Sequence, residues 1–315
     1  MKIAFHDNSI SLRGTTVAVF DYAYWTRKIL GNESIILYNK NHSANSPDVY
    51  NKFAKEFDIF SYDNASEIDS ILSKNGCDVF FMEKAGKQDG VISNVCENWV
   101  HAIGICNKGN IHGDKFALGS RWLSKIVNFD IPYVPYMVSL PDHDENMRAE
   151  LNIPGDAFVF GRNGGIETFD IPWVKQMIIE SLRLRNDVWY VFQFTEQFVQ
   201  HERVIHLNGS SDLNAKTKFI NTCDAMLHAR SVGESFGLSC AEFSIRNKPV
   251  VTWHGSPERS HIDILGDTGI YYNGQNDLLD ILLSMKKEDV ANKDWNCYKD
   301  YSPEIVIEKF KQVYL

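Results

Sequence analysis

The 315-residue sequence has no long hydrophobic run, and this absence bears on where the protein works. No stretch approaches the roughly 18 consecutive apolar residues that a membrane-spanning helix needs. The first residues, Met1 to His6, lead directly into a strand-like apolar run and lack the longer apolar core of a secretory signal peptide. We therefore expect a cytoplasmic protein with no transmembrane segment.

Paired cysteines are also missing. The six cysteines show no Cys-x2-Cys spacing, which zinc sites and redox motifs commonly use. Most of them lie in apolar segments, and this placement favours free, buried thiols in a reducing compartment. The sequence thus predicts no metal site and no disulfide framework.

A surplus of positive charge is absent as well, because 32 Lys and Arg residues stand against 41 Asp and Glu residues, a formal net charge of −9. Such a chain has no global field that would attract nucleic acid or an anionic membrane. Its Trp and Tyr residues are scattered and form no stacking platform for single strands. We therefore expect no nucleic-acid partner, and any anion site has to be local.

The glycine-rich fingerprint of dinucleotide-binding domains does not occur. Neither Gly14 nor the stretch Gly161 to Gly165 forms Gly-x-Gly-x-x-Gly. The sequence therefore argues against an NAD-dependent oxidoreductase.

What the sequence does contain is a regular alternation of strand-like and helix-like segments, with 44% apolar residues. Alternation of this kind predicts an α/β fold of parallel sheets with helices on their faces. One series occupies residues 1–140 and a second occupies residues 157–300, so we expect two Rossmann-like domains. Residues 141–156 are polar between prolines and are predicted to be the linker. A final helix is expected within residues 301–315, because Ser302-Pro303 is a typical helix start.

The stretch from Ser231 to Val251 carries the strongest chemical signal. The apolar run Ala225 to His228 precedes a loop with Glu234, and the segment Gly237 to Arg246 has a helical pattern. In a strand-loop-helix unit the loop lies at the carboxyl end of a parallel sheet, where the N–H groups of the first helical turn can bind an anion such as phosphate. The backbone groups expected to bind it belong to Ser235, Phe236, Gly237 and Leu238.

Residues 233–251 contain Gly-Glu-Ser-Phe-Gly-Leu, then Glu242, then Lys-Pro-Val-Val. This pattern resembles the Glu-x7-Glu signature of retaining family 4 glycosyltransferases, which have the GT-B fold of two Rossmann-like domains facing across a cleft. In that family the first Glu contacts hydroxyls of the donor sugar and the second contacts the nucleotide ribose. The resemblance implies these roles for Glu234 and Glu242. An alternative interpretation makes Glu242 half of an exposed ion pair with Arg246, four positions further on.

The resemblance also implies an activity. A sugar would pass from a nucleotide-diphosphate donor, such as a UDP- or GDP-sugar, to an acceptor hydroxyl with retention of the anomeric configuration, and no metal ion or further cofactor would be needed. The acceptor, a carbohydrate, a glycan or another hydroxyl compound, normally binds the first domain, where the resemblance is only architectural. In this family the C-terminal helix often crosses back to that domain.

An acidic triplet, Asp142-His143-Asp144, has the Asp-x-Asp form that metal-dependent glycosyltransferases of the other major fold use to hold a divalent ion. Its place in the predicted linker favours a solvated charge run instead.

Arg162 matches an arginine that the family places at the end of the first strand of its second domain. A guanidinium in this position suits a diphosphate, because its planar fork of N–H groups binds two oxygens at once. The family usually has a lysine five residues later, where this sequence has Glu167, so one expected cation is missing. Arg13 and Arg230 flank the expected loops and are the candidates to replace it.

Two residues of the first domain complete the predicted site. Gly14 corresponds to the family's glycine-rich loop, where a glycine lets the backbone approach a phosphate or an acceptor, although an ordinary turn explains it equally well. His112 lies on a predicted loop and is a candidate catalytic residue beside Glu234 and Arg162, because many relatives have a histidine near the donor sugar. His101 lies in an apolar run and is predicted to be a core histidine.

Two other functions stay open. A non-catalytic nucleotide- or sugar-binding protein of GT-B shape is favoured by Glu167 in place of lysine, whereas the intact Glu234 and Glu242 favour an enzyme. A nucleotide-sugar epimerase or a phosphorylase-like enzyme of the same architecture differs from a transferase in one measurable respect, namely whether free nucleotide appears only when an acceptor is supplied.

Overall fold

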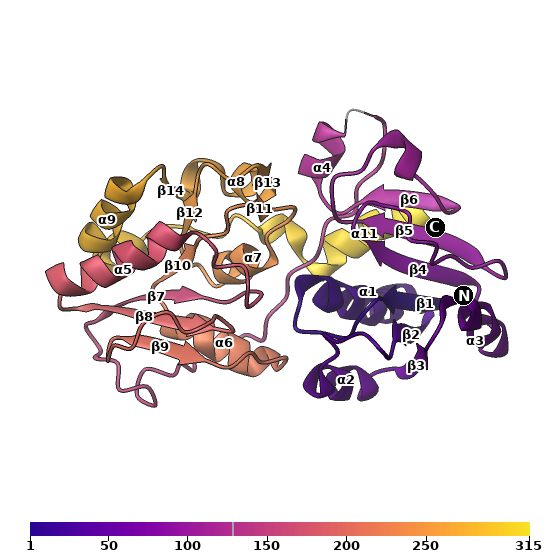
Figure 1. Cartoon of the computed structure of the whole chain (residues 1–315), viewed down its shortest axis with the longest axis horizontal. Coiled ribbons are helices and arrows are strands. Elements are labelled where there is room, and N and C mark those ends of the chain that lie inside the picture. The colour runs from indigo at the N-terminus through magenta and orange to yellow at the C-terminus, as the bar shows by residue number, and fades with distance from the viewer. Residues whose placement is uncertain (128) are drawn as a thin grey trace. The chain divides into compact units, whose positions relative to one another are not determined.

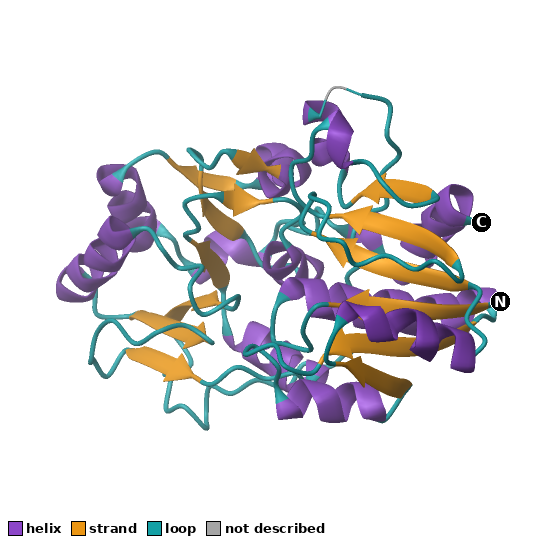
Figure 2. Ribbon diagram, turned by 45° about the vertical axis from the view of Figure 1, so that its right-hand side comes forward, coloured by secondary structure: helices purple, strands orange, loops and turns teal. Residues whose placement is uncertain are grey.

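The computed structural model describes residues 1–127 and 129–315, and these form two compact units. Unit 1 comprises Met1–Met137 and Tyr301–Leu315, and unit 2 comprises Val138–Asp300. Each unit is built on a six-stranded sheet whose described strand pairs are all parallel (Figure 1). Helices lie against the strands in both units (Figure 2). The predicted α/β class with two parallel sheets is confirmed.

The sheet of unit 1 has the strand order β3-β2-β1-β4-β5-β6. Its strands are β1 (Lys2–Asp7), β2 (Glu33–Asn39), β3 (Asp58–Tyr62), β4 (Val79–Lys84), β5 (Glu97–Ala102) and β6 (Lys115–Leu118). Every residue of the central strand β4 is buried, as expected for a parallel strand covered on both faces.

The helices of unit 1 include the C-terminal one. They are α1 (Gly14–Leu30), α2 (Pro47–Ala54), α3 (Ile68–Lys74), α4 (Arg121–Ile126) and α11 (Pro303–Tyr314), with 3-10 turns at Ala65–Glu67 and Lys108–Asn110. On α11, the hydroxyl of Tyr314 donates to the carbonyl of Val100 at 2.9 Å, and the ring of Phe310 lies 5.6 Å from that of Phe81. The C-terminal helix thus packs on the unit 1 sheet.

The sheet of unit 2 has the order β14-β12-β10-β7-β8-β9. Its strands are β7 (Phe158–Arg162), β8 (Val188–Gln193), β9 (Val204–Leu207), β10 (Ala225–His228), β12 (Val250–Trp253) and β14 (Ile270–Tyr272), while β11 (Gly233–Glu234) and β13 (Glu258–Arg259) form a separate parallel pair. Counted along each unit's own six strands, both orders are 3-2-1-4-5-6, which is the Rossmann order.

The helices of unit 2 follow its strands. They are α5 (Pro172–Leu184), α6 (Leu213–Thr222), α7 (Leu238–Ile245), α8 (Ser260–Leu265), α9 (Gln275–Ser284) and α10 (Lys287–Ala291), with 3-10 turns at Gly266–Thr268 and Lys299–Tyr301. The helix predicted over Gly237 to Arg246 is thus confirmed as α7. In a sheet of this order, the chain adds strands in one direction up to the third strand and in the opposite direction from the fourth. The point between the first and fourth strands is the topological switch point, and ligands bind outside the carboxyl ends of these two strands. In unit 2 these strands are β7 and β10.

Candidate active site

The switch point of the unit 2 sheet lies where β7 and β10 pair side by side. Strand β7 ends at Arg162 and β10 ends at His228, and because the strands are parallel their following loops emerge at the same edge. One of these loops continues to Glu234 and to the start of α7. The residues predicted to bind the donor in unit 2 therefore belong to one edge of one sheet.

Glu234 is held on both carboxylate oxygens. Nε2 of His228 lies 3.1 Å from Oε1, and Nη1 of Arg230 donates to Oε2 at 2.8 Å. Burial alone would raise the pKa of Glu234, but the hydrogen bond from His228 and the charges of His228 and Arg230 outweigh it and lower this pKa to about 2. The side chain is 19% exposed, so an ionised acceptor remains open to solvent.

Gly237 forms the turn between Glu234 and α7. Its φ of +90° lies in the left-handed region, and an added Cβ would stand 2.9 Å from Cβ of His261. Gly237 is also the N-cap of α7, and no side chain in the described part of the chain caps the helix there. The first N–H groups of α7, which begins at Leu238, have no partner within the helix, so they suit an anion. Of the four residues predicted to bind it, Gly237 and Leu238 lie at this helix start, and the role of all four stays a prediction.

Phe236 anchors this turn in the core of unit 2. It is 2% exposed, its ring packs edge-on against Tyr298 at 5.6 Å, and its carbonyl accepts a hydrogen bond from the Tyr298 hydroxyl at 3.2 Å. Ser235 and Leu238 on either side are half-buried. The contacts of Phe236 therefore fix this turn against Tyr298.

Glu242 lies inside α7 and is 4% exposed. Its carboxylate accepts from Nζ of Lys216 at 2.6 Å and from Nδ2 of Asn163 at 2.7 Å. The alternative pairing with Arg246 is wrong, because Arg246 turns to Asn221 and to the carbonyl of His143. Helical spacing brings residues i and i+4 near each other, but the carboxylate of Glu242 instead forms a buried ion pair with Lys216 from α6.

Arg162 is 2% exposed, and its guanidinium is bound within unit 2. Nη1 donates to the carbonyl of Phe194 at 3.1 Å and to the hydroxyl of Thr195. Nη2 donates to the carbonyl of Gly165 at 2.8 Å and to the hydroxyl of Thr168 at 2.5 Å. Burial lowers the pKa of Arg162 to about 10, which leaves it charged at neutral pH. This arginine ties the loop after β7 to the loop after β8, and its catalytic role stays a prediction.

Replacing Arg162 by methionine should therefore cost stability. The change leaves buried carbonyl and hydroxyl groups without their donor, and we expect a loss of about 3 kcal/mol in the free energy of unfolding of unit 2. Urea unfolding followed by tryptophan fluorescence measures it. The matched control is Arg183→Met, because that side chain is 71% exposed and its ion pair with Glu180 lies at the surface. Equal stability of the two variants would contradict a structural role for Arg162.

Arg230 differs from Arg162 in exposure. Its side chain is 33% exposed, and among the described residues its guanidinium donates only to Glu234. Glu167, which occupies the position of the expected lysine, is exposed on the loop after β7. Arg13 is exposed just before α1 in unit 1. Arg230 is thus the candidate cation that the structure places beside Glu234.

In unit 1, Gly14 is the exposed first residue of α1, and an added Cβ there would meet no atom within 4 Å. Nothing around it in the described residues requires a glycine. His112 precedes β6 and so lies at the amino-terminal edge of the sheet, opposite the strand carboxyl ends. Its Nδ1 donates to the carbonyl of Asn110 at 2.7 Å. The roles of Gly14 and His112 stay predictions, and this placement lends them no support.

His101 is a buried core histidine, as predicted. Its Nε2 donates to the carbonyl of Val134 at 2.8 Å, and its Nδ1 lies 3.1 Å from Oε1 of Glu83. The hydroxyl of Tyr136 donates to the other oxygen of Glu83 at 2.8 Å. The sequence does not reveal this network, because the pairing of Glu83 with His101 depends on the register between β4 and β5.

Side chains that commonly bind metal ions do not cluster in the part of the chain that the structure describes. Across residues 1–127 and 129–315 there is no group of three or more His, Cys, Asp or Glu side chains that could hold a metal ion. Asp142 and Asp144 of the acidic triplet are exposed and face Arg246 at 2.9 and 3.7 Å. Over the same residues no helix has both the length and the apolar character required to cross a membrane.

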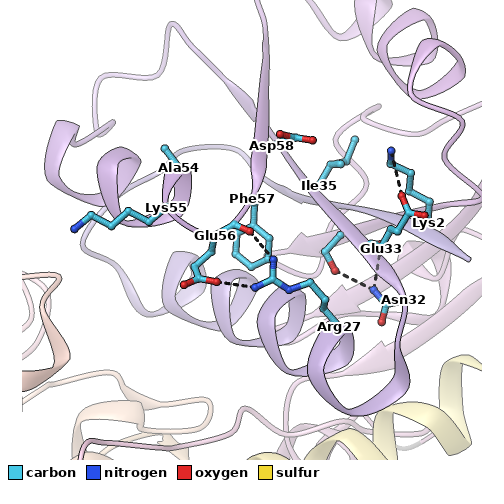
Figure 3. A pocket seen from close by; sticks show the side chains of 11 residues that line it. Lys2, Arg27, Asn32, Glu33, Ile35, Ala54, Lys55, Glu56, Phe57 and Asp58 are labelled. Atoms are coloured by element: carbon cyan, nitrogen blue, oxygen red, sulfur yellow. Dashed lines mark hydrogen bonds and ion pairs between the residues drawn. The ribbon is translucent and has the colours of Figure 1, made fainter.

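A surface pocket of about 500 Å³ lies in unit 1, away from the strand carboxyl ends (Figure 3). Its lining includes Lys2, Glu33 and Asp58, which begin β1, β2 and β3. Arg27 donates to the carboxylate of Glu56 at 2.6 Å along its wall (Figure 3). Charges of both signs balance each other there, and none of the predicted site residues lines it.

Comparison with known proteins identifies the fold. No protein-family model and no curated protein matches the sequence. Among solved structures, HepE from Anabaena in complex with UDP-glucose has a TM-score of 0.71 and 13% identity, over 99% of this chain and 98% of that one. Sucrose-phosphate synthase from Thermosynechococcus elongatus has a TM-score of 0.70 and 12% identity, over 100% and 98%. A putative UDP-N-acetylglucosamine 2-epimerase from Listeria monocytogenes has a TM-score of 0.63 and 14% identity, over 99% and 96%. The chain has the GT-B fold with two Rossmann-like units.

Proposed function

We propose that the protein is a glycosyltransferase that moves a sugar from a nucleotide-diphosphate donor to an acceptor hydroxyl. The observation that carries the proposal is the edge of the unit 2 sheet, where an ionised and partly exposed Glu234 precedes Gly237 and the uncapped start of α7. A carboxylate accepts hydrogen bonds from sugar hydroxyls, and a helix N-terminus binds phosphate. A nucleotide sugar presents both groups next to each other.

The similar folds support the donor class. HepE was solved with UDP-glucose, and the sucrose-phosphate synthase shares the fold over 98% of its length. We infer that the donor is a UDP-sugar, and this class of donor is the first to test.

In the proposed reaction the bond between the anomeric carbon and the diphosphate oxygen breaks, and the acceptor oxygen bonds to the anomeric carbon in its place. The proton of the acceptor hydroxyl passes to the leaving nucleoside diphosphate. Charge accumulates on the leaving diphosphate, and preorganised donors at this point lower the barrier. The N–H groups at the start of α7 and the guanidinium of Arg230 would supply them. Glu234 would orient the sugar through its hydroxyls, and Glu242 would accept from the ribose. Retention, independence of metal ions and a cytoplasmic location are parts of the same proposal.

The test is calorimetric titration of the purified protein with UDP, GDP, ADP and their common sugars, with and without EDTA. We expect one nucleotide family to bind with micromolar affinity and EDTA to leave that affinity unchanged. Failure of all these ligands to bind would contradict the proposal and favour a non-catalytic protein that has lost its donor site, as Glu167 in place of lysine suggests. Loss of binding in EDTA would contradict metal independence alone.

An epimerase is the second candidate, because the Listeria protein has the same fold. Free nucleotide that appears only after an acceptor mixture is added would favour the transferase. A donor sugar that changes configuration while it stays attached to the nucleotide would favour the epimerase.

A further inference from the structure

Behind Glu234 lies a chain of buried polar side chains that the proposed mechanism does not use. Nδ1 of His228 lies 2.8 Å from Oγ1 of Thr252, and that oxygen lies 3.1 Å from Nε2 of His261. The three side chains come from β10, β12 and α8, and they are 5%, 0% and 0% exposed, respectively. The two histidine rings lie 4.9 Å apart. Together these residues form a relay that begins at the carboxylate of Glu234.

The hydrogen bonds of the relay have a definite direction at one end. Because Glu234 is ionised, Nε2 of His228 must carry the proton that Oε1 of Glu234 accepts. The Thr252 hydroxyl has a single proton, so it donates to one ring and accepts from the other. If His228 is neutral, Thr252 donates to its Nδ1 and accepts from His261. If His228 is cationic, both bonds reverse. In both arrangements Nε2–H of His228 points at Glu234.

The far end of the relay is Nδ1 of His261. Nδ1 of His261 is buried, and no described residue hydrogen-bonds to it. Burial lowers the pKa of His261 to about 3, so this ring is neutral. A buried polar atom without a partner costs stability, and native proteins keep few of them. His261 also packs beneath Gly237, whose added Cβ would stand 2.9 Å from its own. The same histidine thus supports both the relay and the turn at the start of α7.

We propose that His228 is the positioning residue for Glu234 and that Thr252 and His261 hold it in place. This inference rests on the proposed function, in which Glu234 accepts hydrogen bonds from the donor sugar. Arg230 also contacts Glu234, but it does so with a flexible, 33% exposed side chain. The buried His228 is the contact that restricts the carboxylate to one orientation. In the proposed complex His228 orients Glu234 toward the sugar, and the groups that we assign to the nucleotide part are Glu242, Arg230 and the start of α7.

The experiment compares UDP with UDP-glucose by calorimetry on the full-length protein. Thr252→Val keeps the size of the side chain and removes the hydroxyl, so the His228 ring loses its fixed orientation. We expect UDP-glucose affinity to fall about 10-fold while UDP affinity changes less than about two-fold, as for loss of one well-aligned hydrogen bond to a charged group. Thr252→Ser restores the hydroxyl and should recover most of the loss. The matched control is Thr26→Val, which removes the hydroxyl of a buried threonine in unit 1.

Two further variants guard against misfolding of Thr252→Val. His228→Gln keeps a nitrogen donor near the Nε2 position and should retain more UDP-glucose affinity than His228→Leu, which removes it. Equal losses for UDP and UDP-glucose in the Thr252 and His228 variants, or no loss in either, would overturn the relay. A wild-type protein that binds neither UDP nor UDP-glucose would instead overturn the proposed function for these donors, and the relay with it.

Discussion

Glu234→Gln is expected to lower the rate of sugar transfer about 1000-fold while the affinity for the nucleoside diphosphate stays within a few-fold of wild type. The amide has nearly the same size but no charge, so it holds the sugar hydroxyls weakly and in a different pattern. It also disturbs both contacts that the carboxylate makes, with His228 and with Arg230. The nucleotide part would bind elsewhere, at the start of α7 and at Glu242. Rates of nucleotide release and calorimetric affinities for UDP separate the two effects.

The companion variant is Glu242→Ala, for which the expected pattern is the reverse. It removes the carboxylate that we assign to the ribose and leaves Lys216 buried without its partner, so nucleotide affinity should fall. Glu202→Gln, an exposed glutamate of unit 2, is the control for both. If Glu234→Gln and Glu242→Ala lost nucleotide affinity equally, the proposed division of roles would be wrong.

Arg230→Gln is expected to weaken UDP binding about 30-fold and to leave uridine binding unchanged, because a charge-assisted hydrogen bond to phosphate is lost. The reason lies in the contrast with Arg162, whose N–H groups are largely committed to loop carbonyls and hydroxyls. Arg230 is the more exposed guanidinium, and it lies beside Glu234. With Glu167 at the position of the expected lysine, Arg230 is our candidate for that charge. The UDP affinity of wild type and variant should also converge at high salt.

Arg183→Gln is the control, since this exposed arginine lies on α5 and pairs with Glu180. A variant that binds UDP as tightly as wild type would exclude Arg230 as the diphosphate ligand. The next candidate would then be Arg162, and the internal contacts of its guanidinium would have to rearrange on binding.

Arg230→Gln should also change how the binding of UDP-glucose depends on pH. In the wild-type protein the pKa of Glu234 is lowered to about 2, so the carboxylate should stay ionised throughout the range in which the protein is handled. Removing Arg230 removes one of the charges that lower this pKa, whereas burial still raises it. When the pH is lowered, the Arg230→Gln variant should therefore lose UDP-glucose affinity at a higher pH than the wild-type protein does.

The overall fold was predictable because its signals are local. Apolar runs of strand length alternate with helical patterns, and only a parallel sheet covered by helices buries both. The start of α7 was predictable for the same reason, since a glycine before an apolar helical segment marks a helix N-terminus within one residue. The sequence could likewise place Glu242 inside a helix, because that assignment depends on neighbouring residues alone. It predicted a loop at Glu234, where the structure has the two-residue strand β11 paired with β13.

Contacts between residues that lie far apart along the chain could not be predicted from these local signals. Lys216 and Asn163 reach Glu242 from other elements, so the ion pair expected with the nearby Arg246 does not form. The commitment of Arg162 to Thr168 and Thr195 could not be read from its place at a strand end.

His112 shows the same limit on the scale of a whole sheet. Its loop was predictable, but only the direction of β6 among parallel strands puts that loop at the amino-terminal edge. The relay from His228 through Thr252 to His261 likewise exists only because β10, β12 and α8 pack together. The sequence by itself determined the alternation of strands and helices in both units, and it placed Glu234 between β10 and α7. The tertiary structure decided which side chains meet there, because hydrogen bonds and ion pairs form between groups that packing brings within about 3 Å, whatever their separation along the chain.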